Sequence, residues 1–169
     1  MIPVDTPFGA MHVTVNAAGV LTELLLPNRA PGALSSPADL SPAARAGFDR
    51  VLSQLDEYFT GRRRSFDLPL EPHGTPFEQR VWLRLQQIPY GATTSYGVIA
   101  EEFGMTNGAR AVGRANGSNP IPIVIPCHRV IGSDGKLTGF GGGLPLKRAL
   151  LELEAGDLRL IPALDRFDR

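Results

Sequence analysis

The stretch Ile121–Val130 constrains this chain more than any other part of its sequence. It is an apolar run interrupted by prolines, and it contains the only cysteine, Cys127, followed directly by His128. Such a run predicts a short buried strand over Ile123–Ile125, and Pro126 should end it because proline has no backbone N–H. Cys127 and His128 would then lie where the chain leaves a core. This position suits a nucleophile, although a cysteine beside a strand is more often inert packing.

The composition excludes a disulfide and a zinc site built on several thiolates. A single cysteine cannot form an internal disulfide, and the three histidines (His12, His73 and His128) lie far apart in the sequence. Structural zinc sites need several cysteine or histidine ligands at close spacing. We therefore expect neither a metal nor a cofactor.

The charges of the chain balance, with 17 acidic and 17 basic residues. Any contact with DNA must therefore come from a local patch, because no global field attracts nucleic acid or a membrane. The N-terminus has no basic segment followed by an apolar core, and no apolar run approaches the roughly 18 residues of a membrane span. These features predict a cytoplasmic protein that does not contact membranes.

The beginning of the chain predicts an antiparallel sheet. Turn clusters at Pro7–Gly9 and Asn16–Gly19 bound two apolar segments, residues 10–15 and 20–26. We expect these segments to pair as antiparallel strands, and Phe66–Leu70 is a candidate for one more strand.

A helix is expected between these strands. Serine is favoured as an N-cap and proline in the first helical turn, so Ser41 and Pro42 should begin it. Apolar residues then recur at helical spacing as far as Phe59. The segment Glu71–Gly74 ends this part, and we predict an N-terminal α/β support domain over residues 1–74.

A capping box begins the second predicted domain, residues 75–169. Thr75 and Glu78 have the required spacing, and Pro76 lies between them at the first helical position. Trp82 falls on the apolar face of this helix, where it should anchor a core.

Two short helices at about 96–103 and 108–116, separated by a turn at Gly104, match the helix-turn-helix pattern. A hairpin over 131–137, with its turn at Asp134-Gly135, would add a wing. A last helix is expected over 145–154, followed by a polar tail. The glycine-rich segment 138–143 is better suited to a pocket wall than to a phosphate cradle, because no Lys-Ser/Thr pair follows it.

The second helix of this pair is slim, because it is rich in alanine and glycine. Arg110 and Arg114, four residues apart, project from one face of it. A slim helix can approach the minor groove, which is only about 6 Å wide.

A free thiol has a pKa of about 8.5 and reacts poorly at neutral pH unless a base takes its proton. His128 can be that base, but neighbouring residues of an extended chain point to opposite sides. Either the chain turns at Pro126-Cys127, or a water relays the proton. An acid must orient the base, and Glu154 is the candidate because its helix is apolar enough to dock on the core. The alternative for Glu154 is an ordinary surface carboxylate.

Pro126–Val130, preceded by Asn119–Ile123, resembles the signature of the O6-alkylguanine-DNA alkyltransferases, also called methylated-DNA–protein-cysteine methyltransferases. The resemblance covers Thr75 to Glu154 closely, whereas the N-terminal part matches only in outline. It implies an α/β (α+β) fold, in which a ribonuclease-H-like N-terminal domain precedes a mostly helical, winged helix-turn-helix domain that binds DNA.

The resemblance also implies direct reversal of DNA damage. The alkyl group of O6-alkylguanine, and by extension of O4-alkylthymine, would move irreversibly to the protein's own cysteine after base flipping, once per molecule. Cys127 would be the acceptor, His128 would deprotonate it through a water, and Glu154 would orient His128. Asn119 would brace this network, and Tyr96 would donate to the flipped guanine so that a neutral base leaves.

The remaining implied roles concern the bound DNA. Arg110 would replace the extruded nucleotide in the stack, the carbonyls of Cys127 and Val130 would accept from the guanine amino group, and the N–H of Gly141 would meet O6. The other residues assigned to substrate or DNA are Ser95, Ala111, Gly113, Arg114, Arg129 and Phe140. Phe140 stands where many members have tyrosine. The expected partner is double-stranded DNA bound through its minor groove, and the protein is expected to be a monomer, with cooperativity on DNA left open.

Two other functions fit the same residues. One is a winged-helix regulator or lesion-binding module in which Cys127 is only structural. The other is a thiol hydrolase that uses Cys127 and His128. The mass of the intact protein after exposure to alkylated DNA distinguishes all three.

Overall fold

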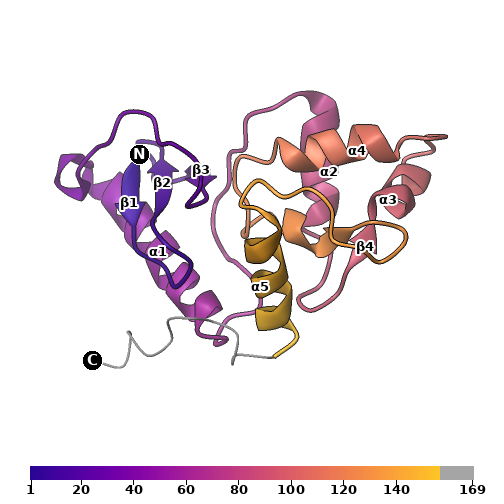
Figure 1. Ribbon diagram of the computed structural model, residues 1–169. Coiled ribbons are helices and arrows are strands. Elements are labelled where there is room, and N and C mark those ends of the chain that lie inside the picture. Colours follow the sequence, from indigo (N-terminus) through magenta and orange to yellow (C-terminus); the bar gives the residue numbers. More distant parts are fainter. Residues whose placement is uncertain (157–169) are drawn as a thin grey trace.

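The N-terminal part of the protein is an antiparallel sheet covered by one long helix (Figure 1). A computed structural model describes residues 1–156; the expected polar tail lies outside the described residues. The three strands pair in the order β1-β2-β3, with Val13 opposite Leu24. The two strands expected from the turn clusters are confirmed, and β1 adds to them. Their bounds are Ile2–Val4 (β1), Met11–Val15 (β2) and Leu21–Leu25 (β3).

Helix α1, Pro42–Phe59, lies against this sheet. It begins as expected at Ser41, whose hydroxyl accepts a hydrogen bond from the backbone N–H of Ala44 at 3.2 Å. Its apolar positions Phe48, Val51, Leu55, Tyr58 and Phe59 are buried, because they recur on the face that meets the strands. A short 3₁₀ turn, Pro37–Asp39, precedes the helix.

The C-terminal part is mostly helical (Figure 1). The expected capping box is present, since Thr75 accepts from the N–H of Glu78 and Glu78 accepts from the N–H of Thr75. Trp82 is a core anchor as expected: it is 1% exposed, and its indole N–H donates to the carbonyl of Ala115 at 2.7 Å. The elements are α2 (Pro76–Leu85), β4 (Thr94–Ser95), α3 (Tyr96–Glu102), α4 (Ala109–Gly117), a 3₁₀ turn η2 (Cys127–Arg129), β5 (Val130–Ile131) and α5 (Leu144–Glu154).

The strand expected at Ile123–Ile125 is wrong. This segment is a tight turn, in which the N–H of Ile125 donates to the carbonyl of Ile121 at 2.9 Å. Ile123 has φ +74°, a strained conformation for a β-branched residue, and its side chain is fully buried. Prolines 120, 122 and 126 remove the donors that a strand would need, so the apolar residues are buried by a loop instead.

Two other expected strands do not form. Residues 66–70 make only an isolated bridge from Leu70 to Leu21, because both backbone groups of Asp67 bond to the side chain of Gln54. The expected hairpin keeps its turn, with the N–H of Gly132 donating to the carbonyl of Lys136. However, its first strand, β5, pairs in parallel with β4 rather than with the segment after the turn. The mixed α/β class is confirmed, with a wing that is a loop.

A close approach of two glycines fixes α1 on the sheet. A Cβ at Gly47 would lie 2.1 Å from the carbonyl oxygen of Gly19. Alanine in a helix interior is normally more stable than glycine by about 1 kcal/mol. We expect Gly47→Ala to destabilise the protein instead, by about 1–3 kcal/mol, because the helix must move off the sheet.

Urea unfolding measures this change. Gly97→Ala is the control, since a Cβ there meets only the Ser95 hydroxyl at an ordinary 3.7 Å. A Gly47→Ala protein as stable as the control variant would contradict the proposed packing constraint.

Candidate active site

The chain turns at Cys127, the first of the two possibilities left open by the sequence. Pro126 precedes the 3₁₀ turn Cys127–Arg129, and the N–H of Arg129 donates to the Pro126 carbonyl at 3.0 Å. Cys127 is 4% exposed and His128 is fully buried. No side-chain hydrogen bond joins these two residues within the described part of the chain. The turn therefore brings thiol and imidazole to one region without direct contact.

His128 is paired with Glu154, which lies at the end of α5. Its Nε2 is 2.9 Å from Glu154 Oε1, and both side chains have no exposed surface. An ionised carboxylate only accepts hydrogen bonds, so Nε2 must carry the proton of the neutral imidazole. Nδ1 is then the basic nitrogen, and it has no hydrogen-bond partner among the described residues.

The Glu154 carboxylate accepts from five donor atoms of the described residues. Oε1 accepts from His128 Nε2 at 2.9 Å, from the Tyr58 hydroxyl at 2.7 Å and from Arg129 Nη2 at 2.8 Å. Oε2 accepts from Arg129 Nε at 2.9 Å and from the N–H of Gly91 at 3.1 Å. Three segments of the chain, besides the helix that carries Glu154, therefore converge on this single buried charge.

Burial and these contacts set the protonation states of the site. Burial raises the pKa of the Cys127 thiol to about 11, although hydrogen bonding by Asn119 and the charge of Lys147 act in the opposite direction. Burial also lowers the pKa of His128, which keeps the imidazole neutral. For Glu154, burial would raise the pKa, but the hydrogen bonds from His128 and Arg129 outweigh it and lower the pKa to about 2.

Asn119 holds the turn that leads to Cys127. Its Nδ2 donates to the Ile125 carbonyl at 2.8 Å, and its Oδ1 accepts from the Ile121 N–H at 3.0 Å. One side chain thus joins both ends of the strained turn. Because Cys127 N–H in turn donates to the Ile125 carbonyl at 2.8 Å, the position of the thiol depends on Asn119.

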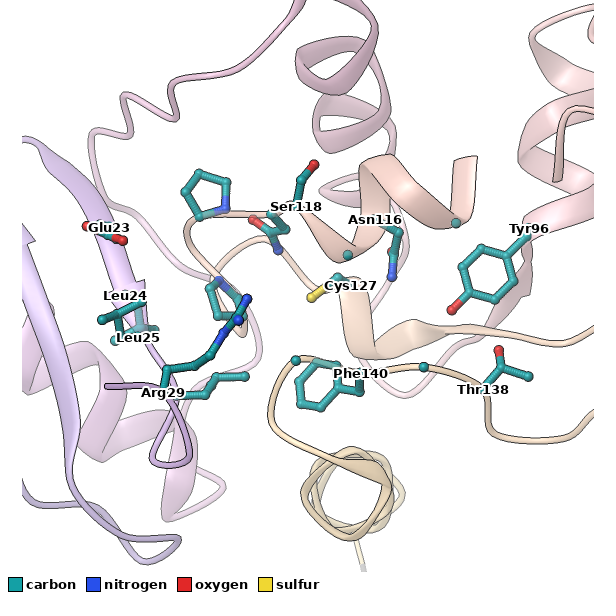
Figure 2. A pocket seen from close by; sticks show the side chains of 18 of the residues that line it. Glu23, Leu24, Leu25, Arg29, Tyr96, Asn116, Ser118, Cys127, Thr138 and Phe140 are labelled. Atoms are coloured by element: carbon teal, nitrogen blue, oxygen red, sulfur yellow. The ribbon is translucent and has the colours of Figure 1, made fainter. Parts of the chain in front are cut away.

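Cys127 lies in the wall of a cavity of about 720 Å³ (Figure 2). Figure 2 shows its sulfur directed into this space, with Tyr96 on one side and Phe140 on the wall below. The Tyr96 hydroxyl remains protonated at neutral pH, since burial raises its pKa. The N-terminal part also contributes, through Leu24, Leu25 and Arg29. Of the residues predicted for the site, seven line the cavity: Tyr96, Arg110, Gly113, Asn119, Cys127, Phe140 and Gly141.

The remaining predicted residues lie outside the cavity wall. His128 and Glu154 are buried and do not line the cavity. Ser95 is the N-cap of α3 and accepts from the N–H of Val98 at 3.2 Å. Arg114, like Arg110, is exposed on α4, which also carries Ala111.

Arg129 is less accessible than an arginine that contacts DNA would need to be. It is 6% exposed, and its guanidinium donates to Glu154 and, through Nη1, to the Ile88 carbonyl at 2.7 Å. A cation in this position belongs to the buried carboxylate rather than to a phosphate. Val130, which is fully buried, already accepts from Lys147, so a guanine amino group would need the second lone pair of its carbonyl oxygen.

Sequence reasoning missed three residues of this region. Lys147 is fully buried and donates to the carbonyls of Val130 at 2.6 Å and Thr138 at 2.7 Å, and burial lowers its pKa to about 8. Asn116 is buried beside the cavity, and its Oδ1 has no partner among residues 1–156. Tyr58 was counted only as part of the apolar stripe of α1. A polar residue at a core position of a helix was the available signal for Lys147 and Tyr58.

No group of three or more histidine, cysteine, aspartate or glutamate side chains within residues 1–156 could hold a metal ion. Among the same residues, no helix is both long and apolar enough to cross a membrane.

Comparisons with known proteins identify relatives of both parts of the chain. Residues 3–72 match the family model described as 6-O-methylguanine DNA methyltransferase, ribonuclease-like domain, and residues 76–156 match the DNA binding domain of the same name. A methylated-DNA–protein-cysteine methyltransferase of Mycobacterium tuberculosis is 48% identical over 151 residues, which cover 89% of each chain. The enzyme of that name from Methanosarcina barkeri is 54% identical over 112 residues, 66% of this chain and 71% of its own.

Solved structures agree with these matches. The crystal structure of Mycobacterium tuberculosis OGT in complex with DNA superposes with a TM-score of 0.80 at 46% identity, covering 94% of this chain and 97% of the other. An O6-methylguanine-DNA methyltransferase from Pyrococcus kodakaraensis has a TM-score of 0.52 at 20% identity, with 90% and 98% covered, and supports the fold alone.

The buried Arg129–Glu154 pair predicts a large loss of stability when one partner is removed. We expect Arg129→Met to lower the free energy of unfolding by about 3–5 kcal/mol, because Glu154 keeps its charge without its cation. Arg84→Met is the control. Its ion pair with Glu102 is partly exposed at the surface, and its loss should change stability by less than about 1 kcal/mol.

Urea unfolding of both variants at neutral pH checks this prediction. Equal losses in the two variants would mean that Arg129 does not compensate a buried charge.

Proposed function

The chain belongs to the 6-O-methylguanine DNA methyltransferase family, whose members repair DNA by direct reversal through alkyl transfer to a cysteine of the protein, and we propose that Cys127 is the acceptor here. The observation that carries this proposal is the position of the thiol, which lines a cavity of about 720 Å³ and is followed in the chain by His128, the buried partner of Glu154. Cys127 is also the only cysteine of the chain. It is therefore the one thiol in the chain that can accept the methyl group in the methyltransferase reaction of this family.

The proposed reaction is one nucleophilic displacement. The thiol proton passes to His128 Nδ1, the sulfur attacks the alkyl carbon, and an S–C bond forms as the C–O6 bond breaks. The electron pair of that bond stays with guanine, which takes a proton from the Tyr96 hydroxyl and leaves as a neutral base. The thioether product retains the alkyl group, so each molecule reacts once.

The protonation states support this sequence of proton transfers. A thiol of pKa about 11 remains protonated at neutral pH and needs a base at the moment of reaction. His128 is buried and neutral, and its Nε2–H is committed to Glu154, so Nδ1 is available as the acceptor. The thiol and the imidazole share no direct hydrogen bond, and we propose that a water relays the proton between them. Asn119 positions the turn and lowers the pKa of the thiol.

We propose O6-alkylguanine in double-stranded DNA as the substrate, with O4-alkylthymine as a second one. Either base must leave the duplex to reach a buried thiol, at an energetic cost that is smallest for a poorly paired lesion. The carbonyls of Cys127 and Val130 and the N–H of Gly141 would bind the flipped guanine. Phe140 would form an apolar wall beside it without a hydroxyl.

DNA would bind along α4 through its minor groove. Arg110 and Arg114 are exposed on this helix, and Arg110 also lines the cavity, where it can replace the flipped nucleotide. The small residues Ala111 and Gly113 allow close approach, and Ser95, which caps α3, is a further proposed DNA contact. We propose that Arg129 neutralises the buried charge of Glu154 and does not contact DNA.

We also propose that the chain consists of two domains. Residues 1–74 form a support domain, and residues 75–169 form an alkyltransferase and DNA-binding domain. We further propose a cytoplasmic monomer that needs no metal or cofactor, with cooperative binding to DNA left open.

The mass of the intact protein tests the acceptor. After mixing with a duplex oligonucleotide that contains O6-methylguanine, we expect a gain of one methyl group, located on Cys127, and never more than one per molecule. Cys127→Ala should gain no mass yet retain DNA binding. Binding without modification of the native protein would favour a lesion-binding module, and repeated turnover would favour a hydrolase.

Arg110→Ala tests base flipping. We expect it to slow methyl transfer from duplex DNA at least tenfold, because no side chain would then fill the gap left by the flipped nucleotide. A tenfold change in rate corresponds to about 1.4 kcal/mol in activation free energy. The reaction with free O6-alkylguanine base should not slow, and neither should the reaction of Arg148→Ala, which changes an exposed arginine of α5. Equal slowing with duplex and free base would refute this role.

A further inference from the structure

The N-terminal domain contacts the reacting group of residues directly. Tyr58, the penultimate residue of α1, is fully buried, and its ring packs against Phe66 and Tyr90 with centroids 5.3 and 6.1 Å away. Its hydroxyl lies 2.7 Å from Glu154 Oε1 and 3.5 Å from His128 Nε2. Tyr58 is 96 residues from Glu154 in the sequence, so this contact exists only because the two domains pack together.

We propose that Tyr58 is a positioning residue of the alkyl-transfer site, through which the N-terminal domain controls the His128–Glu154 pair. The proposal rests on the roles given above to His128 and Glu154. It assigns a chemical task to a domain whose expected role was support.

The direction of the hydrogen bond follows from the chemistry of the two groups. Glu154 is ionised, because its pKa is held near 2, and an ionised carboxylate cannot donate. Burial beside this charge raises the pKa of Tyr58 well above its usual value, so the phenol keeps its proton. Tyr58 therefore donates to Oε1, the oxygen that also accepts from His128 Nε2.

Two consequences follow for the imidazole. The hydroxyl holds Oε1 with a hydrogen bond from α1, which opposes rotation of the carboxylate away from Nε2. It also takes up part of the negative charge of Oε1, which weakens the attraction of Glu154 for a protonated His128. The first effect keeps Nε2–H directed at Glu154 and leaves Nδ1 free, and the second favours the neutral imidazole that must accept the thiol proton.

The other charged or titratable groups around the pair come from several elements. Arg129 in η2 contacts Glu154. The charge of Lys147 in α5 lowers the pKa of both His128 and Cys127, and Tyr90, in the loop after α2, is close enough to Glu154 for that charge to raise its pKa. Replacement of Tyr58 changes none of these groups. An altered pH dependence in a Tyr58 variant can therefore be attributed to the lost hydroxyl.

Tyr58→Phe removes this hydroxyl and keeps the ring. The measurement is the single-turnover rate of methyl transfer from a duplex oligonucleotide containing O6-methylguanine, across a range of pH. We expect a rate about tenfold lower at neutral pH, the usual effect of losing one hydrogen bond to a charged group. The acidic limb of the profile should move to higher pH, because Glu154 then holds a proton on His128 more strongly and this proton must be lost before reaction.

Tyr90→Phe is the matched control. Its hydroxyl is close to the same pair but donates to the backbone carbonyl of Leu153 at 3.3 Å. Its rate and pH profile should match those of the native protein. DNA affinity and thermal stability are measured for both variants.

A fluorinated tyrosine at position 58 provides an independent test that preserves packing and folding. Its more acidic phenol is a stronger donor, so the acidic limb should move in the opposite direction, to lower pH. An acidic limb unmoved by either replacement would overturn the proposal, even if Tyr58→Phe were slower, since uniform slowing reflects packing alone. Failure of the proposed function looks different: the native protein itself would then gain no methyl group on Cys127.

Discussion

The buried carboxylate of Glu154 is the interaction on which both the fold and the reaction depend. An ionised carboxylate inside a protein is strongly unfavourable unless donors and a cation surround it. Here α1 supplies the Tyr58 hydroxyl, the turn after Cys127 supplies His128 and Arg129, and the loop after α2 supplies the N–H of Gly91. The charge can be buried only when these segments have assembled, so the reactive geometry and the native packing form together.

The same burial explains why a single-use thiol can persist. Cys127 is protonated and almost inaccessible, with a pKa of about 11, and protonated thiols react slowly with electrophiles. The proposed proton acceptor, His128, is buried and paired with Glu154, and neither side chain lines the cavity. In the proposed reaction, an alkylated DNA base that fits the cavity lies against the thiol. Its alkyl carbon is then close to the sulfur at the moment when the thiol proton is transferred.

Local signals in the sequence predicted most helices, whereas contacts between distant residues were beyond them. Ser41 and the Thr75–Glu78 capping box fixed two helix starts, since capping depends on neighbours a few residues apart. The apolar run at Ile123–Ile125 predicted a strand, but a strand needs backbone donors and a partner, and the surrounding prolines and Asn119 make a turn instead. Tyr58 matched the apolar stripe of its helix, and nothing nearby in sequence indicates that its hydroxyl would meet a charge. Periodicity records which side of a helix is buried, but not what it is buried against.

Several of these contacts between distant residues lie at the interface between the two domains. The N–H of Leu24 donates to the Pro120 carbonyl at 2.8 Å, and Asn28 donates at 2.9 Å to the carbonyl of Gly141, which lines the cavity. Together with Tyr58, these contacts join the N-terminal domain to the turn before Cys127, to the cavity wall and to Glu154. These contacts are what the proposed role of Tyr58 requires, because displacement of either domain would change the turn before Cys127, the cavity wall and the surroundings of Glu154 at the same time.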